Sequence, residues 1–238
     1  MPYREEVFTA PGYREVKKYF CYRLGGKANR IQSTRKTPPN IEEANRKRRE
    51  EKLFRLILTN YKRDDLYVTL TYAEEPTYEE GRRQMKNFLL RLRRLYKKRG
   101  LELKYIYTTE YRGERLHHHL MINDGVTRAE CEELWGQGLI PYHGFRRYDG
   151  RPEDAKAVAA YMIKETGRMP REYSQLSYVA SRNLTPPKVV KRTIHSSRWR
   201  ERPRPPQGME LVDVLNFVTD DGYPMQKAVF RKRGRQIE

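Results

Sequence analysis

The residues of this chain best suited to chemistry lie in the segment "EYRGERLHHH", residues 110–119. His117 and His119 are two positions apart and would share one face of a β-strand, because side chains alternate between the faces of a sheet. His118 would then point to the opposite, buried side. "YRGER" is typical of a turn, and a hairpin would bring Glu110 close to the histidine pair. Two imidazoles and a carboxylate can bind a divalent cation, although the same residues could also serve only to pack a hairpin.

A second pair with chemical potential is Tyr161 and Lys164 in "AVAAYMIKET". Three positions apart, they would lie on the same face of a helix. A tyrosine can act as a covalent nucleophile when its phenolate is stabilised and its target is activated. A neighbouring ammonium favours the phenolate or meets the charge of a phosphate. The alternative is a half-buried tyrosine beside a solvated lysine.

The composition favours a polyanionic partner. The 238 residues include 50 Lys and Arg against 31 Asp and Glu, which gives a net charge of +19. No segment approaches the ~20 apolar residues of a membrane-spanning helix, and no N-terminal apolar core suggests a signal peptide. Cys21 and Cys131 show neither a disulfide framework nor zinc spacing. We therefore expect a cytoplasmic protein that binds nucleic acid rather than a membrane.

Local patterns predict the elements that position these residues. Thr77 with Glu80, and Thr127 with Glu130, form capping-box patterns that predict helix starts. The first opens a helix over about 78–99, before Gly100. The second opens a short helix that ends near "LWGQG". Further helices are predicted over 41–61 and about 152–166, and strands over 65–72, 103–110 and 116–123.

This order of elements predicts an α+β fold, with a central antiparallel sheet and helices on one of its faces. Residues 1–44 and 196–238 are basic and contain several prolines, so we expect two extensions around a catalytic domain over 45–195. Within the second extension, "MELVDVLNFV" predicts a strand or a short helix.

Three motifs in order resemble the HUH endonucleases, the rolling-circle replication initiators of phages, plasmids and small circular genomes. "YVTLTY" resembles their first motif, "TEYRGERLHHHL" their acidic ligand and His-hydrophobe-His, and Tyr161 with Lys164 their third. "LWGQG" and "SRNLTPP" also resemble the version found in Gram-positive bacteria and their phages. The resemblance covers roughly residues 45–190. It departs from the family at His118, which stands where a hydrophobic residue is usual.

The resemblance implies an RRM-like, ferredoxin-like palm and a single-tyrosine initiator. His117, His119 and Glu110 would hold Mg²⁺ or Mn²⁺ at a replication origin in single-stranded DNA. Tyr161, supported by Lys164, would form a 5′-phosphotyrosine link, release a 3′-OH and later rejoin ends. No P-loop motif occurs, so a separate helicase and a host polymerase are expected partners. The candidate DNA contacts are arginines: Arg112, Arg115, Arg146, Arg147 and Arg182.

Other functions fit parts of the pattern. A transposase or conjugative relaxase of the HUH type would share the chemistry. A non-catalytic DNA-binding protein would explain the charge but not the order of Glu110, the histidines and Tyr161. An RNA-binding fold of the same topology would use exposed aromatics on its sheet. His143 and His195 have no evident partner in the sequence and are expected to be structural or surface residues.

Overall fold

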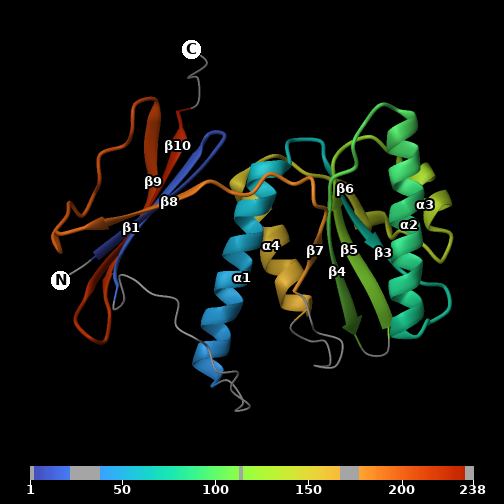
Figure 1. Ribbon diagram of the computed structural model, residues 1–238, viewed down its shortest axis with the longest axis horizontal. Coiled ribbons are helices and arrows are strands. Elements are labelled where there is room, and N and C mark those ends of the chain that lie inside the picture. The colour runs from blue at the N-terminus through green and yellow to red at the C-terminus, as the bar shows by residue number, and fades with distance from the viewer. Residues whose placement is uncertain (1–2, 22–37, 113–114, 167–176, 234–238) are drawn as a thin grey trace. The chain divides into compact units, whose positions relative to one another are not determined.

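A computed structural model describes residues 3–21, 38–112, 115–166 and 177–233, without the side chains of 111, 112, 165 and 166 (Figure 1). The chain divides into two compact units. One comprises residues 38–185, and the other combines residues 1–37 with residues 186–238. Both are built on a five-stranded antiparallel sheet.

The sheet of the unit 38–185 has the strand order β6-β3-β5-β4-β7. Its central hairpin is β4–β5, as the sequence predicts, and β3 pairs with β5. The fold is α+β, which confirms the predicted class. The strands are β3 (Leu66–Leu70), β4 (Tyr105–Arg112), β5 (Arg115–Ile122), β6 (Phe145–Arg147) and β7 (Val179–Ala180).

One face of this sheet is covered by α2 (Tyr78–Lys98) and α3 (Arg128–Trp135) (Figure 1). Both helices begin with the predicted capping boxes, in which a threonine hydroxyl accepts from a backbone N–H and a glutamate accepts in return. Between these helices and the sheet lies an apolar core that includes Val68, Phe88 and Trp135. Burial of these side chains fixes the faces of β3 and β5.

The opposite face of the sheet has helices as well, contrary to the expectation of helices on one face only. There α1 (Pro39–Asn60) and α4 (Pro152–Thr166) pack against each other, and α4 contacts β4 (Figure 1). The reason is that each helix has its own apolar stripe to bury, Leu53 and Ile57 on α1 and Val158 on α4. Tyr61, just after α1, donates to the carbonyl of Met121 on β5 (3.3 Å).

The sequence did not predict β6, whose three residues lie between two of the predicted helices. Two of the three are arginines, so nothing in the local pattern marks a strand. Pairing with β3 provides the backbone partners, with Val68 opposite Phe145. A short 3₁₀ turn, η1 (Tyr142–Gly144), leads into this strand.

The second unit is a sheet with the order β8-β1-β2-β10-β9. Residues 3–20, expected to belong to a basic extension, instead form a hairpin in the middle of this sheet, with Gly12 at φ +68° in its turn. The segment "MELVDVLNFV" is a strand, β9. The strands are β1 (Tyr3–Ala10), β2 (Tyr13–Phe20), β8 (Val189–Ile194), β9 (Met209–Val218) and β10 (Pro224–Lys232).

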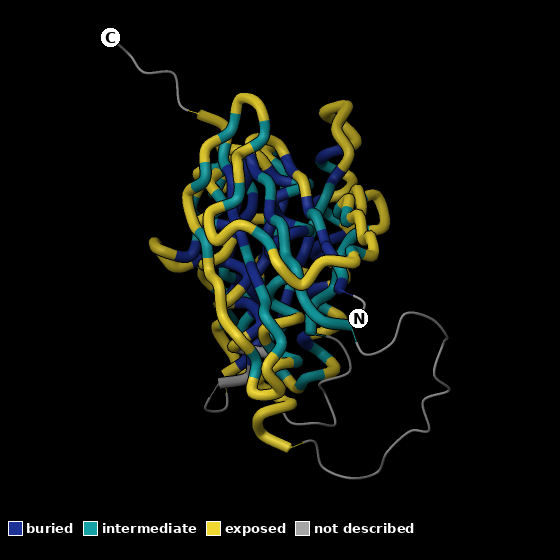
Figure 2. The backbone as a smooth tube through the Cα atoms, turned by 90° about the vertical axis from the view of Figure 1, so that its left-hand side faces the viewer, coloured by how far each residue is buried: buried dark blue, intermediate teal, exposed yellow. Residues whose placement is uncertain are grey.

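Charge pairing explains how so polar a sequence forms a sheet. On β2, Tyr13 and Glu15 are buried, and the other residues of the strand are only partly buried; Figure 2 colours the backbone by burial. The buried carboxylate of Glu15 forms ion pairs with the ammonium groups of Lys17 (3.8 Å) and of Lys227 on β10 (3.0 Å). The assignment of a catalytic domain to residues 45–195 stays a prediction. Among the described residues, no helix has the length and apolar character needed to cross a membrane.

Candidate active site

The three histidines divide between the two faces of β5 as the alternation predicts. His118 is fully buried beneath α2 and α3, with its ring 5.9 Å from that of Trp135. Its Nε2 is hydrogen-bonded to the hydroxyl of Tyr72 (2.8 Å), and its Nδ1 to the hydroxyl of Thr109 (3.0 Å). Burial lowers the pKa of His118 to about 3, because desolvation disfavours the charged imidazolium. His118 is therefore a neutral structural residue of the core.

His119 lies on the other face and is held by three side chains. Its Nε2 is hydrogen-bonded to a carboxylate oxygen of Glu110 (2.9 Å). Its Nδ1 lies 3.1 Å from the hydroxyl of Tyr67 and 3.3 Å from that of Thr69. Both His119 and Glu110 are 3% exposed. The β4–β5 hairpin thus brings together two of the residues that the sequence places at a metal site.

His117 lies directly across the hairpin from Glu110 in the strand register. Its side chain is only half-buried, and partial desolvation lowers its pKa. His117, His119 and Glu110 therefore occupy one face of the hairpin, as predicted. Among the described residues, however, no three His, Cys, Asp or Glu side chains are already arranged around a point that could hold a metal ion.

The donor chemistry of this face nevertheless suits a divalent cation, because imidazole nitrogens and a carboxylate are common ligands of such ions. The Nδ1 of His119 already contacts hydroxyl groups, so Nε2, the atom next to Glu110, is the nitrogen that could bind a metal ion. Hydrogen bonds of this kind to the far nitrogen of a histidine orient the ring toward a metal. The residues present therefore fit the ion that the sequence pattern implies.

Tyr161 approaches the same face from α4. Its ring meets that of His119 edge-on, with centroids 4.9 Å apart and planes at 88°. The tyrosine is 43% exposed, so part of the side chain faces solvent. Lys164, one helical turn later, is exposed. The fold therefore brings the predicted nucleophile to the histidines.

Arg146 on β6 attaches the beginning of α4 to the sheet. Its guanidinium donates two hydrogen bonds to the carboxylate of Asp154 on α4, at 2.9 and 2.7 Å. This pair is of the bidentate, charge-assisted kind, which fixes geometry as well as adding energy. The same guanidinium lies 5.1 Å from the centroid of the Tyr67 ring. It thus connects the helix that carries Tyr161 to the strand residue that contacts His119.

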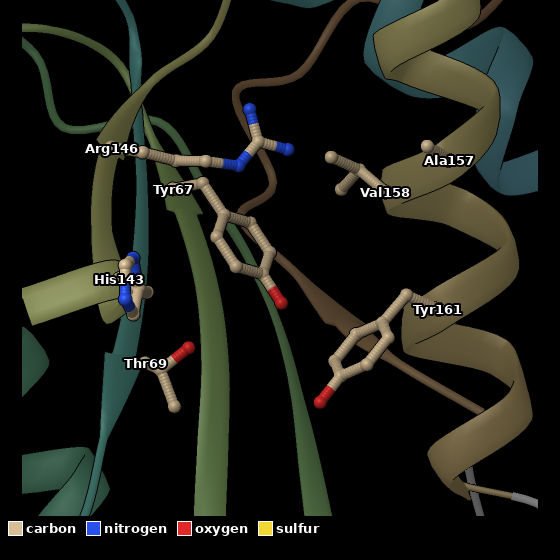
Figure 3. Close-up of a pocket in the computed structure, with 7 residues that line it drawn as sticks. All are labelled: Tyr67, Thr69, His143, Arg146, Ala157, Val158 and Tyr161. Carbon is tan, nitrogen blue, oxygen red and sulfur yellow. The ribbon is translucent and has the colours of Figure 1, made fainter. Parts of the chain in front are cut away.

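A cavity of about 330 Å³ opens between the sheet and α4 (Figure 3). Tyr67 from β3 and Tyr161 from α4 extend into it from opposite sides (Figure 3). A tyrosine nucleophile, hydroxyl groups and a guanidinium around one space can accommodate a phosphodiester. The lining residues are Tyr67, Thr69, His143, Arg146, Ala157, Val158 and Tyr161.

Residues 65–166 match the family model described as replication-associated protein ORF2/G2P. The matched span runs from just before β3 to the end of α4 and contains Glu110, both histidines of the site and Tyr161. The match supports a replication-associated role. No curated protein and no solved structure gave a significant match.

Three polar residues inside the matched span, Tyr67, Thr69 and His143, line the cavity but are not among the site residues that the sequence predicts. Tyr67 and Thr69 lie in the first motif. They are two positions apart and so share one face of β3, where Thr69 is paired with His119; this spacing was the available signal. His143, expected to be a structural or surface residue, lies on η1 at the cavity wall. Nothing in its local sequence indicates this position, which depends on the pairing of β6 with β3.

The predicted DNA-contacting arginines have different environments. Among those with described side chains, Arg146 alone lines the cavity, and it is paired with Asp154. Arg147 is exposed and lies 3.6 Å from a carboxylate oxygen of Asp124. Their role in DNA binding stays a prediction. Arg115 and Arg182 are exposed, and the side chain of Arg112 lies outside the described residues.

Proposed function

We propose that this protein is a rolling-circle replication initiator that nicks single-stranded origin DNA through Tyr161. One observation carries the proposal. The tyrosine ring lies 4.9 Å from the ring of His119, whose imidazole is hydrogen-bonded to Glu110, within the span that matches the replication-associated family. A half-exposed tyrosine beside a buried histidine–carboxylate pair and an open cavity suits attack on a phosphodiester.

In this reaction the phenolic oxygen of Tyr161 forms a bond to phosphorus, and the bond from phosphorus to the 3′ oxygen breaks. The phenol loses its proton, and the leaving oxygen gains one to become a free 3′-OH. The products are a 5′-phosphotyrosine link and a primer end that a host polymerase can extend. The reverse attack by a 3′-OH would rejoin ends and release the tyrosine. In this proposal the ammonium of Lys164 favours the phenolate or meets the phosphate charge.

His117, His119 and Glu110 are the residues proposed to hold Mg²⁺ or Mn²⁺. Such an ion supplies positive charge that neutralises phosphate oxygens during the displacement. Tyr67 and Thr69 hold the imidazole of His119 by its Nδ1 and so fix the direction of Nε2. On this proposal unwinding of duplex DNA requires a separate helicase.

A covalent-adduct assay tests the nucleophile. The chain is incubated with Mn²⁺ and end-labelled single-stranded DNA from the replicon that encodes it, and denaturing gels detect label attached to protein. The label is placed at the 3′ end, because the 5′-phosphotyrosine link keeps the 3′ part of the strand on the protein. We expect Tyr161→Phe to abolish the adduct while DNA binding persists. Tyr142→Phe is the matched control, because Tyr142 is 81% exposed on the neighbouring η1.

Two results would count against the proposal. An adduct that persists in Tyr161→Phe would mean that another residue is the nucleophile. A parent protein that binds the DNA but forms no adduct with either Mg²⁺ or Mn²⁺ would favour the non-catalytic DNA-binding alternative. A transposase or relaxase shares the chemistry, and it would instead cut DNA from the ends of a mobile element or from a transfer origin.

A further inference from the structure

Four aromatic side chains gather at one end of the second unit's sheet. Tyr3 begins β1 and lies opposite Phe20, the last residue of β2. The ring of Tyr3 meets those of Phe20 and Trp199 edge-on, each at 5.5 Å between centroids. Tyr223 stacks on Phe20 at 3.8 Å with an interplanar angle of 2°. Tyr3 is buried, but the other three rings are only half-buried. They therefore keep accessible aromatic surface.

A cavity of about 510 Å³ lies beside these rings, bounded by two ordered turns. In one turn the hydroxyl of Ser196 accepts from the N–H of Arg198 (3.1 Å) and donates to its carbonyl (2.7 Å). In the other the N–H of Thr219 donates to the carbonyl of Tyr223 (2.9 Å). The lining residues are Tyr3, His195, Ser197, Arg198, Gly222, Tyr223 and Pro224.

The chemistry of this cavity is aromatic and cationic. Its lining includes a guanidinium, an imidazole and two phenol rings, and none of the lining side chains is a carboxylate. The ammonium of Lys18 lies 5.5 Å from the centroid of the Trp199 ring, which adds positive charge next to the rings. The volume of the cavity lies within the range of small-molecule sites. A planar ring that carries a negative group fits these features.

We propose that this cavity binds one nucleotide of single-stranded DNA, with the base against the exposed aromatic surface and the phosphate near Arg198. The inference rests on the proposed function and deepens it, because it gives the strand an anchor in the unit that does not contain Tyr161. Aromatic platforms with nearby cations are the usual means of holding single strands without reading their sequence. Binding here is accordingly tolerant of sequence and weakened by salt.

The test measures the affinity of the full-length chain for fluorescein-labelled (dT)₂₀ by fluorescence anisotropy at fixed salt. Arg198→Ala and Tyr223→Ala should each weaken binding by about tenfold, in line with the loss of one stacked base or its phosphate contact. Arg200→Ala and Phe217→Ala remove the same kinds of side chain from exposed positions outside the cavity. These controls should stay within about twofold of the parent.

Intrinsic fluorescence gives a second readout. The chain has two tryptophans, and Trp135 is fully buried in the other unit. Unlabelled (dT)₂₀ should therefore quench the emission of Trp199, and Trp199→Phe should abolish this quenching. Quenching that is unchanged in Trp199→Phe would overturn the proposal.

Other outcomes are equally decisive. Arg198 is exposed, so its substitution should leave the fold intact. Parent-like binding by Arg198→Ala would overturn the inference even if Tyr223→Ala fails to fold. Binding of (rU)₂₀ as tight as that of (dT)₂₀ would overturn the assignment to DNA. The adduct assay is independent, because Tyr161 lies in the other unit. If the parent protein forms no adduct, and Arg198→Ala still binds (dT)₂₀ more weakly than the parent, then nicking is refuted and this site is supported.

Discussion

Replacing His118 by alanine tests whether the middle histidine is structural. The substitution removes a fully buried ring that packs beside Trp135, and it leaves the hydroxyl of Thr109 without the imidazole that it contacts at 3.0 Å. Tyr72 keeps a hydrogen bond to the carbonyl of Gly81 (3.3 Å). A buried ring-to-alanine change costs about 3–5 kcal/mol, and loss of the hydrogen bond to the part-buried hydroxyl of Thr109 about 0.5–1.5 kcal/mol. Because the two effects overlap, we expect His118→Ala to lower the free energy of unfolding by about 4 kcal/mol.

The assay is urea unfolding followed by circular dichroism, in EDTA so that metal binding does not contribute. His117→Ala is the matched control. Its side chain is half-buried on the other face of the same strand, so we expect a loss below about 1 kcal/mol. The interpretation would be wrong if His118→Ala were as stable as the parent, or if His117→Ala were the more destabilising change.

The same histidine makes stability depend on pH. Its pKa is lowered from 6.5 to about 3 in the fold, so the unfolded chain binds the proton more readily. Its contribution is therefore fully present above pH 6.5 and is lost as the pH falls from 6.5 toward 3. Between pH 7.5 and 5.5 the parent should lose about 1.4 kcal/mol through this residue alone. His118→Leu should remove that part of the slope, and an unchanged slope would refute the assignment.

Three further predictions concern other parts of the molecule. His119→Ala should abolish adduct formation at every Mg²⁺ or Mn²⁺ concentration while DNA binding persists, and an adduct formed with the same metal dependence as in the parent would contradict its role as a ligand. Arg146→Ala should slow adduct formation by about tenfold, because α4 loses its attachment to β6, whereas Arg94→Ala, at an exposed position on α2, should not; equal rates for the two would argue against positioning. Burial raises the pKa of the Cys131 thiol to about 12, so iodoacetamide at pH 8 should leave Cys131 unmodified in the native protein and alkylate it in urea, as read by peptide mass spectrometry. Alkylation of Cys131 in the native protein would show that α3 opens.

The placement of the histidines and of Glu110 could be predicted because it depends on local rules. Alternation along a strand places His117 and His119 on one face and His118 on the other, whatever the rest of the fold. The turn sequence before them makes a hairpin, which brings Glu110 opposite His117. The capping residue Thr77 predicts where α2 begins. Each inference uses only neighbours within one or two elements.

The second unit depends on pairing between distant segments. Strands β1 and β2 are stable in a sheet because β8 and β10, from the other end of the chain, pair on either side of them. The same pairing brings Lys227 to the buried Glu15. In the sequence, the charge and the prolines of these segments favoured a basic extension. A strand whose partners lie about 200 residues away has no local signature of that partnership.

Tertiary structure alone decided how the site is enclosed. The sequence determined which residues could act, because the types and spacing of Glu110, the histidines and Tyr161 are local properties. The packing of α4 against the sheet decided that Tyr161 meets His119 and that Arg146 ties this helix to β6. It also placed His143 at the cavity wall. Such contacts depend on the burial of apolar stripes on separate elements, and no local pattern states which stripes will meet.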